Sequence, residues 1–197
     1  MDRFRGYIAG IGTASGTRLV VGHWLESPFG AFTDVMAENA SGSRLLLAPR
    51  REIADYISGT YSFDAVDVAD VEARLTADQL LVSAGPLRLR ADLGPRTFLG
   101  QLLERVPPAV AVHPRWLGAI SPLAGLLVRG VRTSGSAGGG RREYYGVRSI
   151  RSLTGALASW DGRDLGGLSP IYPPVRFGFS SVPPKPQIVA VTTSIVS

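Results

Sequence analysis

The chain has 197 residues, of which 45% are hydrophobic and 19% are charged, and none is a cysteine. Lysine and arginine outnumber aspartate and glutamate by 21 to 16, so the formal net charge is +5. This length suits one domain over residues 1–197 that needs no covalent or metal staples. The lack of cysteine excludes disulfides, thiolate nucleophiles and cysteine-ligated metal sites.

Arginine supplies all but one of the basic side chains, because Lys185 is the only lysine. One interpretation is the base composition of the genome. The other is selection for bidentate recognition of carboxylates or phosphates, which arginine performs better than lysine. Net charge by itself bears on solubility and anionic partners, and says nothing of the fold.

The apolar stretches are too short to predict a membrane segment. The longest, Leu117–Val128, is interrupted by Pro122, whereas a membrane-spanning helix needs about 20 apolar residues. The N-terminus lacks the apolar core of a signal peptide. We therefore expect a soluble, cytoplasmic protein with no membrane partner.

The N-terminal quarter of the chain predicts β-strands. Residues 4–12 and 18–26 flank a short turn and are typical of a hairpin. Along residues 18–26 the side chains alternate between two faces, with His23 on the aliphatic face and Trp24 on the opposite face. Further strands are predicted over residues 31–38 and 45–47.

The middle of the chain mixes strands with helical patterns. Residues 49–58 have one narrow apolar face and predict a helix. Residues 95–130 carry helical spacing interrupted by prolines, and predict a helical insertion that covers a barrel opening or packs outside it. Between them lie strand patterns at residues 60–76, 79–84 and 86–93.

The most distinctive stretch is residues 135–162, where a glycine-rich start leads into paired arginines, two tyrosines and a long β-like run. It is too long for one ordinary strand, so Gly146 or Gly155 is expected to bend it. Residues 175–181 and 187–195 then predict a closing hairpin, each with alternate apolar side chains on one face.

These segments predict a mainly β fold, because short strands recur with turns between them. We expect an antiparallel β-barrel of about nine or ten strands, with helices at residues 49–58 and 95–130. A closed barrel is favoured because it leaves no exposed strand edge. A β-sandwich is the second choice.

His23 and Asp34 are the candidate acid–base pair. If the aliphatic face of residues 18–26 looks inward, His23 lies in the lumen and can exchange protons near neutral pH. Asp34 shares its face with Phe32 and Met36, so the pair can meet across neighbouring strands if that face is also inward. The alternatives are a core histidine bonded to a neighbouring carbonyl, and a reversed register that solvates Asp34.

Six arginines lie between Arg129 and Arg151. They are interpreted either as a solvated face with a flexible loop or as a clamp for a carboxylate, a phosphate or a pantetheine-type tail. Nucleic acid is not an expected partner, because a binding groove interleaves stacking aromatics with basic residues over a broad face. The glycine loop 135–140 precedes a strand and lacks the P-loop lysine, so it does not predict a nucleotide site.

No metal and no cofactor are expected from the inventory of side chains. Only two histidines exist, His23 and His113, so a histidine-rich metal site is excluded. The nucleophile elbow G-x-S-x-G of the α/β-hydrolases is absent from the sequence.

Three blocks, VVGHWLESPFGAFTDVM, GSAGGGRREYYG and PPVRFGFSS, resemble those of conserved actinobacterial proteins. That resemblance covers most of the chain and implies no activity. The strand-rich architecture also loosely resembles the acetoacetate decarboxylase-like barrels, at the level of fold. Decarboxylases of that family depend on a Schiff-base lysine beside a second lysine, whereas Lys185 stands alone between prolines.

The leading hypothesis is a soluble barrel whose lumen binds a small, mostly apolar or amphipathic ligand with one anionic group. The candidate ligand-binding residues are Trp24, Tyr145, Phe177 and Phe179 as walls, and Arg142 and Arg148 as anion partners. The first alternative is an enzyme of lyase, isomerase or cyclase type that uses His23 and Asp34. The second is a non-catalytic interaction protein whose basic surface binds an acidic partner. A homodimer is compatible with each of these hypotheses.

Overall fold

The computed structural model describes residues 1–98, 100, 134–136, 142–178 and 182–196. In chain order the elements are β1 (Asp2–Thr13), β2 (Arg18–Glu26), β3 (Phe32–Glu38), β4 (Arg44–Ala48), α1 (Arg51–Ser58), β5 (Ala65–Val68), β6 (Val71–Leu75), β7 (Gln79–Ala84), β8 (Leu87–Arg96), β9 (Ser134–Ser136), β10 (Arg142–Trp160), β11 (Arg163–Asp164), β12 (Leu168–Ser169) and β13 (Gln187–Val196).

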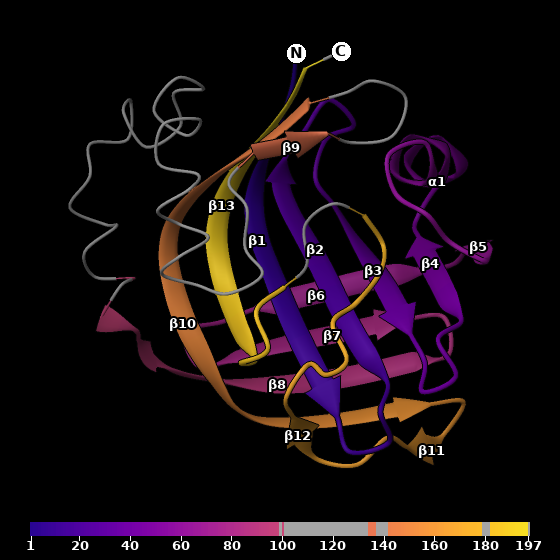
Figure 1. The fold of residues 1–197 in the computed structure, drawn as a ribbon, viewed down its shortest axis with the longest axis vertical. Coiled ribbons are helices and arrows are strands. Elements are labelled where there is room, and N and C mark those ends of the chain that lie inside the picture. The colour runs from indigo at the N-terminus through magenta and orange to yellow at the C-terminus, as the bar shows by residue number, and fades with distance from the viewer. Residues whose placement is uncertain (99, 101–133, 137–141, 179–181, 197) are drawn as a thin grey trace.

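The strands form one sheet that curls into a half-barrel (Figure 1). Its main path runs β5-β4-β3-β2-β1-β13-β10-β8-β7-β6, while β9, β11 and β12 pair beside that path. The predictions of a mainly β fold and of about ten strands are confirmed. The two ends of the path, β5 and β6, are not paired with each other within the described residues, so the cylinder is incomplete.

Every strand pair in the described chain is antiparallel except β4 with β5, which are parallel. The helix α1 and the residues after it carry the chain back before β5 begins, and a parallel pair requires such a crossover. The sheet is therefore mixed, where the sequence predicted an antiparallel one. The helix itself confirms the prediction for residues 49–58, and its apolar face buries Ile53, Ala54 and Ile57.

Strand β10 joins the two halves of the half-barrel. Its first part pairs with β13 and its second part with β8. The register shifts between Val147 and Ser149 and twice more before Gly155, and such bulges bend and twist a strand. The expected bend near Gly146 or Gly155 is present at both places. Residues 134–136, predicted as loop, form β9 and pair with the start of β10.

The predicted closing hairpin has only one of its two strands. Residues 187–195 lie within β13, but Val175, Arg176 and Phe177 are not in a strand. The backbone N–H of Arg176 donates to the Glu38 carboxylate, and the Phe177 carbonyl accepts from Ser62. These partners replace the strand hydrogen bonds that the alternating pattern predicted.

The helical insertion predicted for residues 95–130 is described only in part. Residues 95 and 96 belong to the end of β8 rather than to a helix. Residues 101–130 lie outside the described part of the chain.

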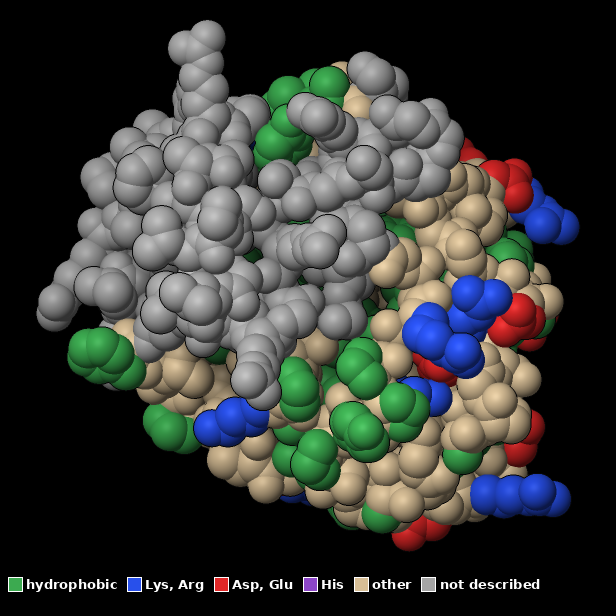
Figure 2. Space-filling model, in the orientation of Figure 1, with side chains coloured by type: hydrophobic (Ala, Val, Ile, Leu, Met, Phe, Trp, Pro, Cys, Tyr) green, Lys and Arg blue, Asp and Glu red, His purple; other side chains and the backbone are tan. Residues whose placement is uncertain are grey.

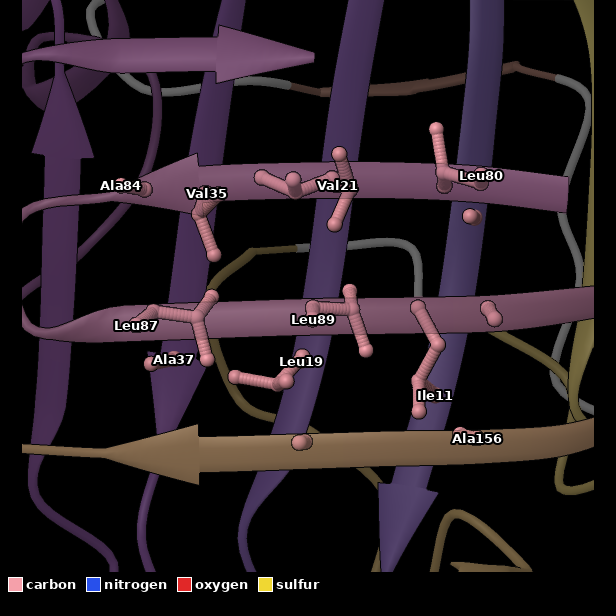
Figure 3. Packing of buried hydrophobic residues seen from close by; sticks show 14 of the residues in the cluster. Ile11, Leu19, Val21, Val35, Ala37, Leu80, Ala84, Leu87, Leu89 and Ala156 are labelled. Atoms are coloured by element: carbon pink, nitrogen blue, oxygen red, sulfur yellow. The ribbon is translucent and has the colours of Figure 1, made fainter. Parts of the chain in front are cut away.

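The main hydrophobic core lies between β1–β3 and the strands that cross them from β7, β8 and the second part of β10 (Figure 3). Ile11, Leu19, Val21 and Val35 point from one layer toward Leu89 and its neighbours in the other. All of these side chains are nearly inaccessible to solvent. This face of β1–β3 is thus mostly occupied by the core.

Basic and acidic side chains lie side by side on the face shown in Figure 2. Arg44 pairs with Asp64 at 2.8 Å, Arg50 pairs with Glu52 at 3.1 Å, and Arg5 pairs with Glu26. Exposed pairs of this kind contribute little to stability. Among the described residues, no helix is long and apolar enough to cross a membrane.

Candidate ligand-binding cavity

A cavity of about 190 Å³ lies on the face of the sheet opposite the main core. Its floor comes from alternate residues of β3, β2, β1, β13 and β10. Its walls come from the end of α1 with the residues after it, and from the loop between β12 and β13. The lining side chains include Phe4, Ile8, Val20, Trp24, Phe32, Asp34, Met36, Tyr56, Ile57, Tyr61, Tyr145, Val147, Ile150, Val175, Phe177, Val189, Val191, Thr193 and Ile195.

The floor follows from the period of two along each strand. On β13, Val189, Val191, Thr193 and Ile195 all line the cavity, as their shared face in the sequence predicted. On β2, the even-numbered residues Val20, Gly22 and Trp24 line the cavity, while Leu19 and Val21 lie in the core.

A buried carboxylate stabilises the wall that is formed by the loop between β12 and β13. We call residues 170–178, which run from Pro170 to Gly178, the strap. Glu38 is fully buried and accepts hydrogen bonds from the Arg176 backbone N–H at 2.8 Å and from its Nε at 3.0 Å. Arg18, itself 2% exposed, lies 3.4 Å from the same carboxylate and donates to the Pro173 carbonyl at 2.9 Å. The strap is therefore tied to β2 and β3 by charge, which places Val175 and Phe177 over the floor.

Asp34 is the only carboxyl group among the described lining residues. Its side chain is 2% exposed, and its Oδ1 accepts a hydrogen bond from Trp24 Nε1 at 3.0 Å. Burial raises the pKa of Asp34 to about 7, although hydrogen bonds from the Trp24 indole and from its own backbone N–H favour the charged form. A cavity carboxyl that titrates near neutral pH suits both proton transfer and ligand recognition.

Gly22 is the residue that makes room for this pair. It lies directly opposite Asp34 in the β2–β3 register. A Cβ at Gly22 would lie 2.6 Å from Asp34 Oδ1 and 2.7 Å from Trp24 Nε1. The carboxyl and the indole therefore meet over a position that has no side chain.

Two further polar features lie elsewhere on the lining. The Tyr61 and Tyr145 hydroxyls are 2.8 Å apart, which links the wall after α1 to β10. Thr193, on the strand next to Tyr145, is 3% exposed, and its Oγ1 has no hydrogen-bond partner among the described residues. These hydroxyls can orient a polar group on a ligand.

His23 does not join Asp34. In the β2–β3 register His23 is opposite Thr33, and its Nδ1 lies 2.8 Å from the Thr33 hydroxyl oxygen. The imidazole also stacks on Tyr7, with ring centroids 6.5 Å apart. Burial lowers the pKa of His23. The expected His23–Asp34 pair is corrected on this point: the two residues have opposite parity in the register, so they point to opposite faces of the sheet.

The other predicted ligand-binding residues divide into three groups. Trp24, Tyr145 and Phe177 line the cavity. Arg148 has an exposed side chain and is not part of the lining. The side chain of Arg142 and the whole of Phe179 lie outside the described part of the chain.

The sequence reading missed Gly22, Tyr61 and Thr193 as parts of the site. Thr193 could have been predicted as a polar site residue, because it interrupts an otherwise aliphatic face of β13. Gly22 shares its face with Trp24, which marked a gap in that face. Tyr61 follows α1 in a loop, where no periodic pattern shows its direction.

Among the described residues, no group of three or more histidine, aspartate or glutamate side chains is placed so that it could hold a metal ion. Lys185 is exposed in its turn and does not line the cavity. The described lining therefore has no amine for a Schiff base.

The sequence matches no family model and no curated protein. Among solved structures, the crystal structure of an acetoacetate decarboxylase from Legionella pneumophila is similar to this chain. The alignment covers 99% of this chain and 84% of that one, at 12% identity and a TM-score of 0.44. This agrees with the loose resemblance of architecture noted from the sequence, and at these values it carries no activity and no residue role to this chain. The actinobacterial resemblance stays a prediction.

Substitution Asp34→Asn should make stability less dependent on pH. The raised pKa means that the folded state keeps a proton which the unfolded state loses, so the free energy of unfolding of the wild type falls as pH rises from about 4 to 7. The variant has no such loss. Its stability relative to wild type should rise over that range by up to about 4 kcal/mol, measured by urea denaturation at several pH values. A difference that does not change with pH would contradict the assignment.

Substitution Glu38→Gln should destabilise the protein by about 3 kcal/mol, because it leaves the buried Arg18 guanidinium without its counter-charge. Chemical denaturation measures the loss. Glu26→Gln is the matched control, since it removes the exposed partner of Arg5 and should leave the unfolding midpoint almost unchanged. Equal effects of the two substitutions would show that the strap is not held by Glu38.

Proposed function

We propose that this protein binds a small, mostly apolar ligand in the cavity beside Asp34. The observation that carries the proposal is the composition of the lining, in which aliphatic and aromatic side chains surround a few polar groups. Small-molecule sites have this composition, because apolar walls supply affinity and a few polar groups fix the orientation.

The size of the cavity limits the ligand. An enclosed apolar cavity of about 150 Å³ holds a benzene molecule, and this cavity measures about 190 Å³. A compound with one six-membered ring and a short substituent fits that space.

The anionic group of the predicted ligand has no support among the described lining residues, and the side chain of its other predicted partner, Arg142, lies outside the described part of the chain. The exposed Arg148 does not line the cavity, and no lysine or arginine is among the described lining residues.

Acid–base catalysis is the second candidate function. It is favoured by Asp34, whose pKa of about 7 allows it to accept and return a proton near neutral pH. The carboxyl faces a cavity where a carbonyl compound could bind, which suits reactions that begin with removal of a proton next to a carbonyl. His23 has no part in this chemistry, because it lies on the other face of the sheet.

Filling the cavity should abolish binding of an apolar probe. Val189 lies on the floor and is half-buried, so Val189→Phe places a ring in the space that toluene would occupy. Toluene should raise the melting temperature of the wild type and should not raise that of the variant. Leu157→Phe, on the exposed face of β10, is the control and should respond like the wild type. An unchanged response in Val189→Phe would exclude the cavity as the site.

Asp34→Asn should slow proton exchange strongly if the cavity is catalytic. With cyclohexanone in deuterated buffer, Asp34 would take a proton from the carbon next to the carbonyl and return a deuteron. Nuclear magnetic resonance should show exchange faster than in buffer alone, and at least about tenfold slower with the variant. Glu26→Gln should keep the wild-type rate. Exchange at the rate of buffer alone would remove this candidate for ketones of this size.

A further inference from the structure

The charge of the cavity lining is unbalanced. Asp34 is the only carboxyl among the described lining residues, and no lysine, arginine or histidine lines the cavity with it. The remaining ionisable side chains among the described lining residues are tyrosines, which carry no positive charge. Within the described residues, an ionised Asp34 is therefore a buried negative charge that has hydrogen bonds from the Trp24 indole and from its own backbone N–H, and no positively charged partner.

The other buried acidic residue of β3, Glu38, has its negative charge neutralised. Glu38 has two guanidinium groups, those of Arg18 and Arg176, within 3.4 Å and 3.0 Å. Asp34, four residues earlier on β3, has no guanidinium partner among the described residues. A buried charge without a partner is costly, so a bound cation would gain free energy at Asp34 by supplying the missing charge.

The walls near Asp34 are aromatic, which also favours a cation. Trp24 and Phe32 line the cavity from neighbouring strands, Tyr61 lines it from the residues after α1, and Phe177 lines it from the strap. The Trp24 ring is fixed by its bond to Asp34 and by an edge contact with Phe4, with centroids 5.5 Å apart. Aromatic faces attract ammonium groups, and most strongly where water is excluded.

We propose that the cavity selects small hydrophobic amines, with the ammonium group at Asp34 and the apolar body against the aromatic walls. This inference rests on the proposed ligand binding and names the class of ligand. The complex is the same whether an ammonium meets the carboxylate or a neutral amine takes the proton of the carboxylic acid. Because Gly22 has no side chain, the carboxyl and the indole can both lie close to β2, and Asp34 is among the residues that line the cavity.

The test compares four probes that share one ring: benzylamine, benzyl alcohol, benzoate and toluene. Dissociation constants are measured by calorimetry near pH 8, or by the shift in melting temperature where binding is weak. Benzylamine should bind at least tenfold more tightly than benzyl alcohol and benzoate. The benzoate arm also tests the anionic ligand predicted from the sequence.

Three variants identify the group responsible. Asp34→Asn should bring benzylamine to within about twofold of benzyl alcohol, with toluene binding retained. Asp34→Leu should do the same, and keeps the test valid if the buried asparagine amide disturbs the fold. Asp67→Asn removes an exposed carboxylate from β5 and should keep the full preference for the amine.

Each outcome has a distinct meaning. The inference is overturned if benzylamine binds no more tightly than benzyl alcohol, or if its advantage survives in both Asp34 variants. If toluene and benzyl alcohol still bind in that case, and Val189→Phe abolishes their binding, the proposal of ligand binding in the cavity is supported and only the preference for amines is rejected. If none of the four probes binds, both the proposed function and this inference fail.

Discussion

The double burial of β1, β2 and β3 is the constraint on which the rest of this structure depends. One face of these strands packs against β7 and β8 as the main core. The other face is also apolar, so it too must be covered, and α1 and the strap cover it. The cavity lies between these covers and the floor. A sheet with one polar face would have needed neither cover and would have no such site.

The two buried carboxylates on β3 have different roles: Glu38 stabilises the strap, and Asp34 lines the cavity. Glu38 is neutralised by Arg18 and Arg176, and in return it fixes the strap as a wall. Asp34 accepts a hydrogen bond from the Trp24 indole and has no positively charged partner in the part of the chain that the structure describes. The first arrangement resembles an internal ion pair, which is costly to break and specifies a conformation. In the second arrangement the carboxylate charge inside an apolar cavity is not neutralised by the described residues, and a cationic ligand or a transferred proton can neutralise it.

The candidate site was partly predictable. Trp24, Asp34, Tyr145 and Phe177 were chosen from the sequence and do line the cavity. The acid–base pairing was wrong, because His23 was placed inward on the evidence of its aliphatic neighbours. Of those neighbours, Leu19 and Val21 do lie inside, but in the core rather than in the cavity, and Leu25 is exposed. Alternation separates the two faces of a strand, and when both faces are buried it does not show which of them bounds the empty space.

The sequence by itself determined the mainly β class, about ten strands, the helix at residues 49–58 and the absence of a paired lysine. These properties depend on side-chain period, turn residues and composition, all of which are local. Only the tertiary structure decided that the half-barrel stays open, that Asp34 meets Trp24, and that the segment around Arg176 becomes a strap rather than a strand. These outcomes depend on contacts such as that between Glu38 and Arg176, whose partners are 138 residues apart, and no local pattern in the sequence encodes which distant partner a buried group will find.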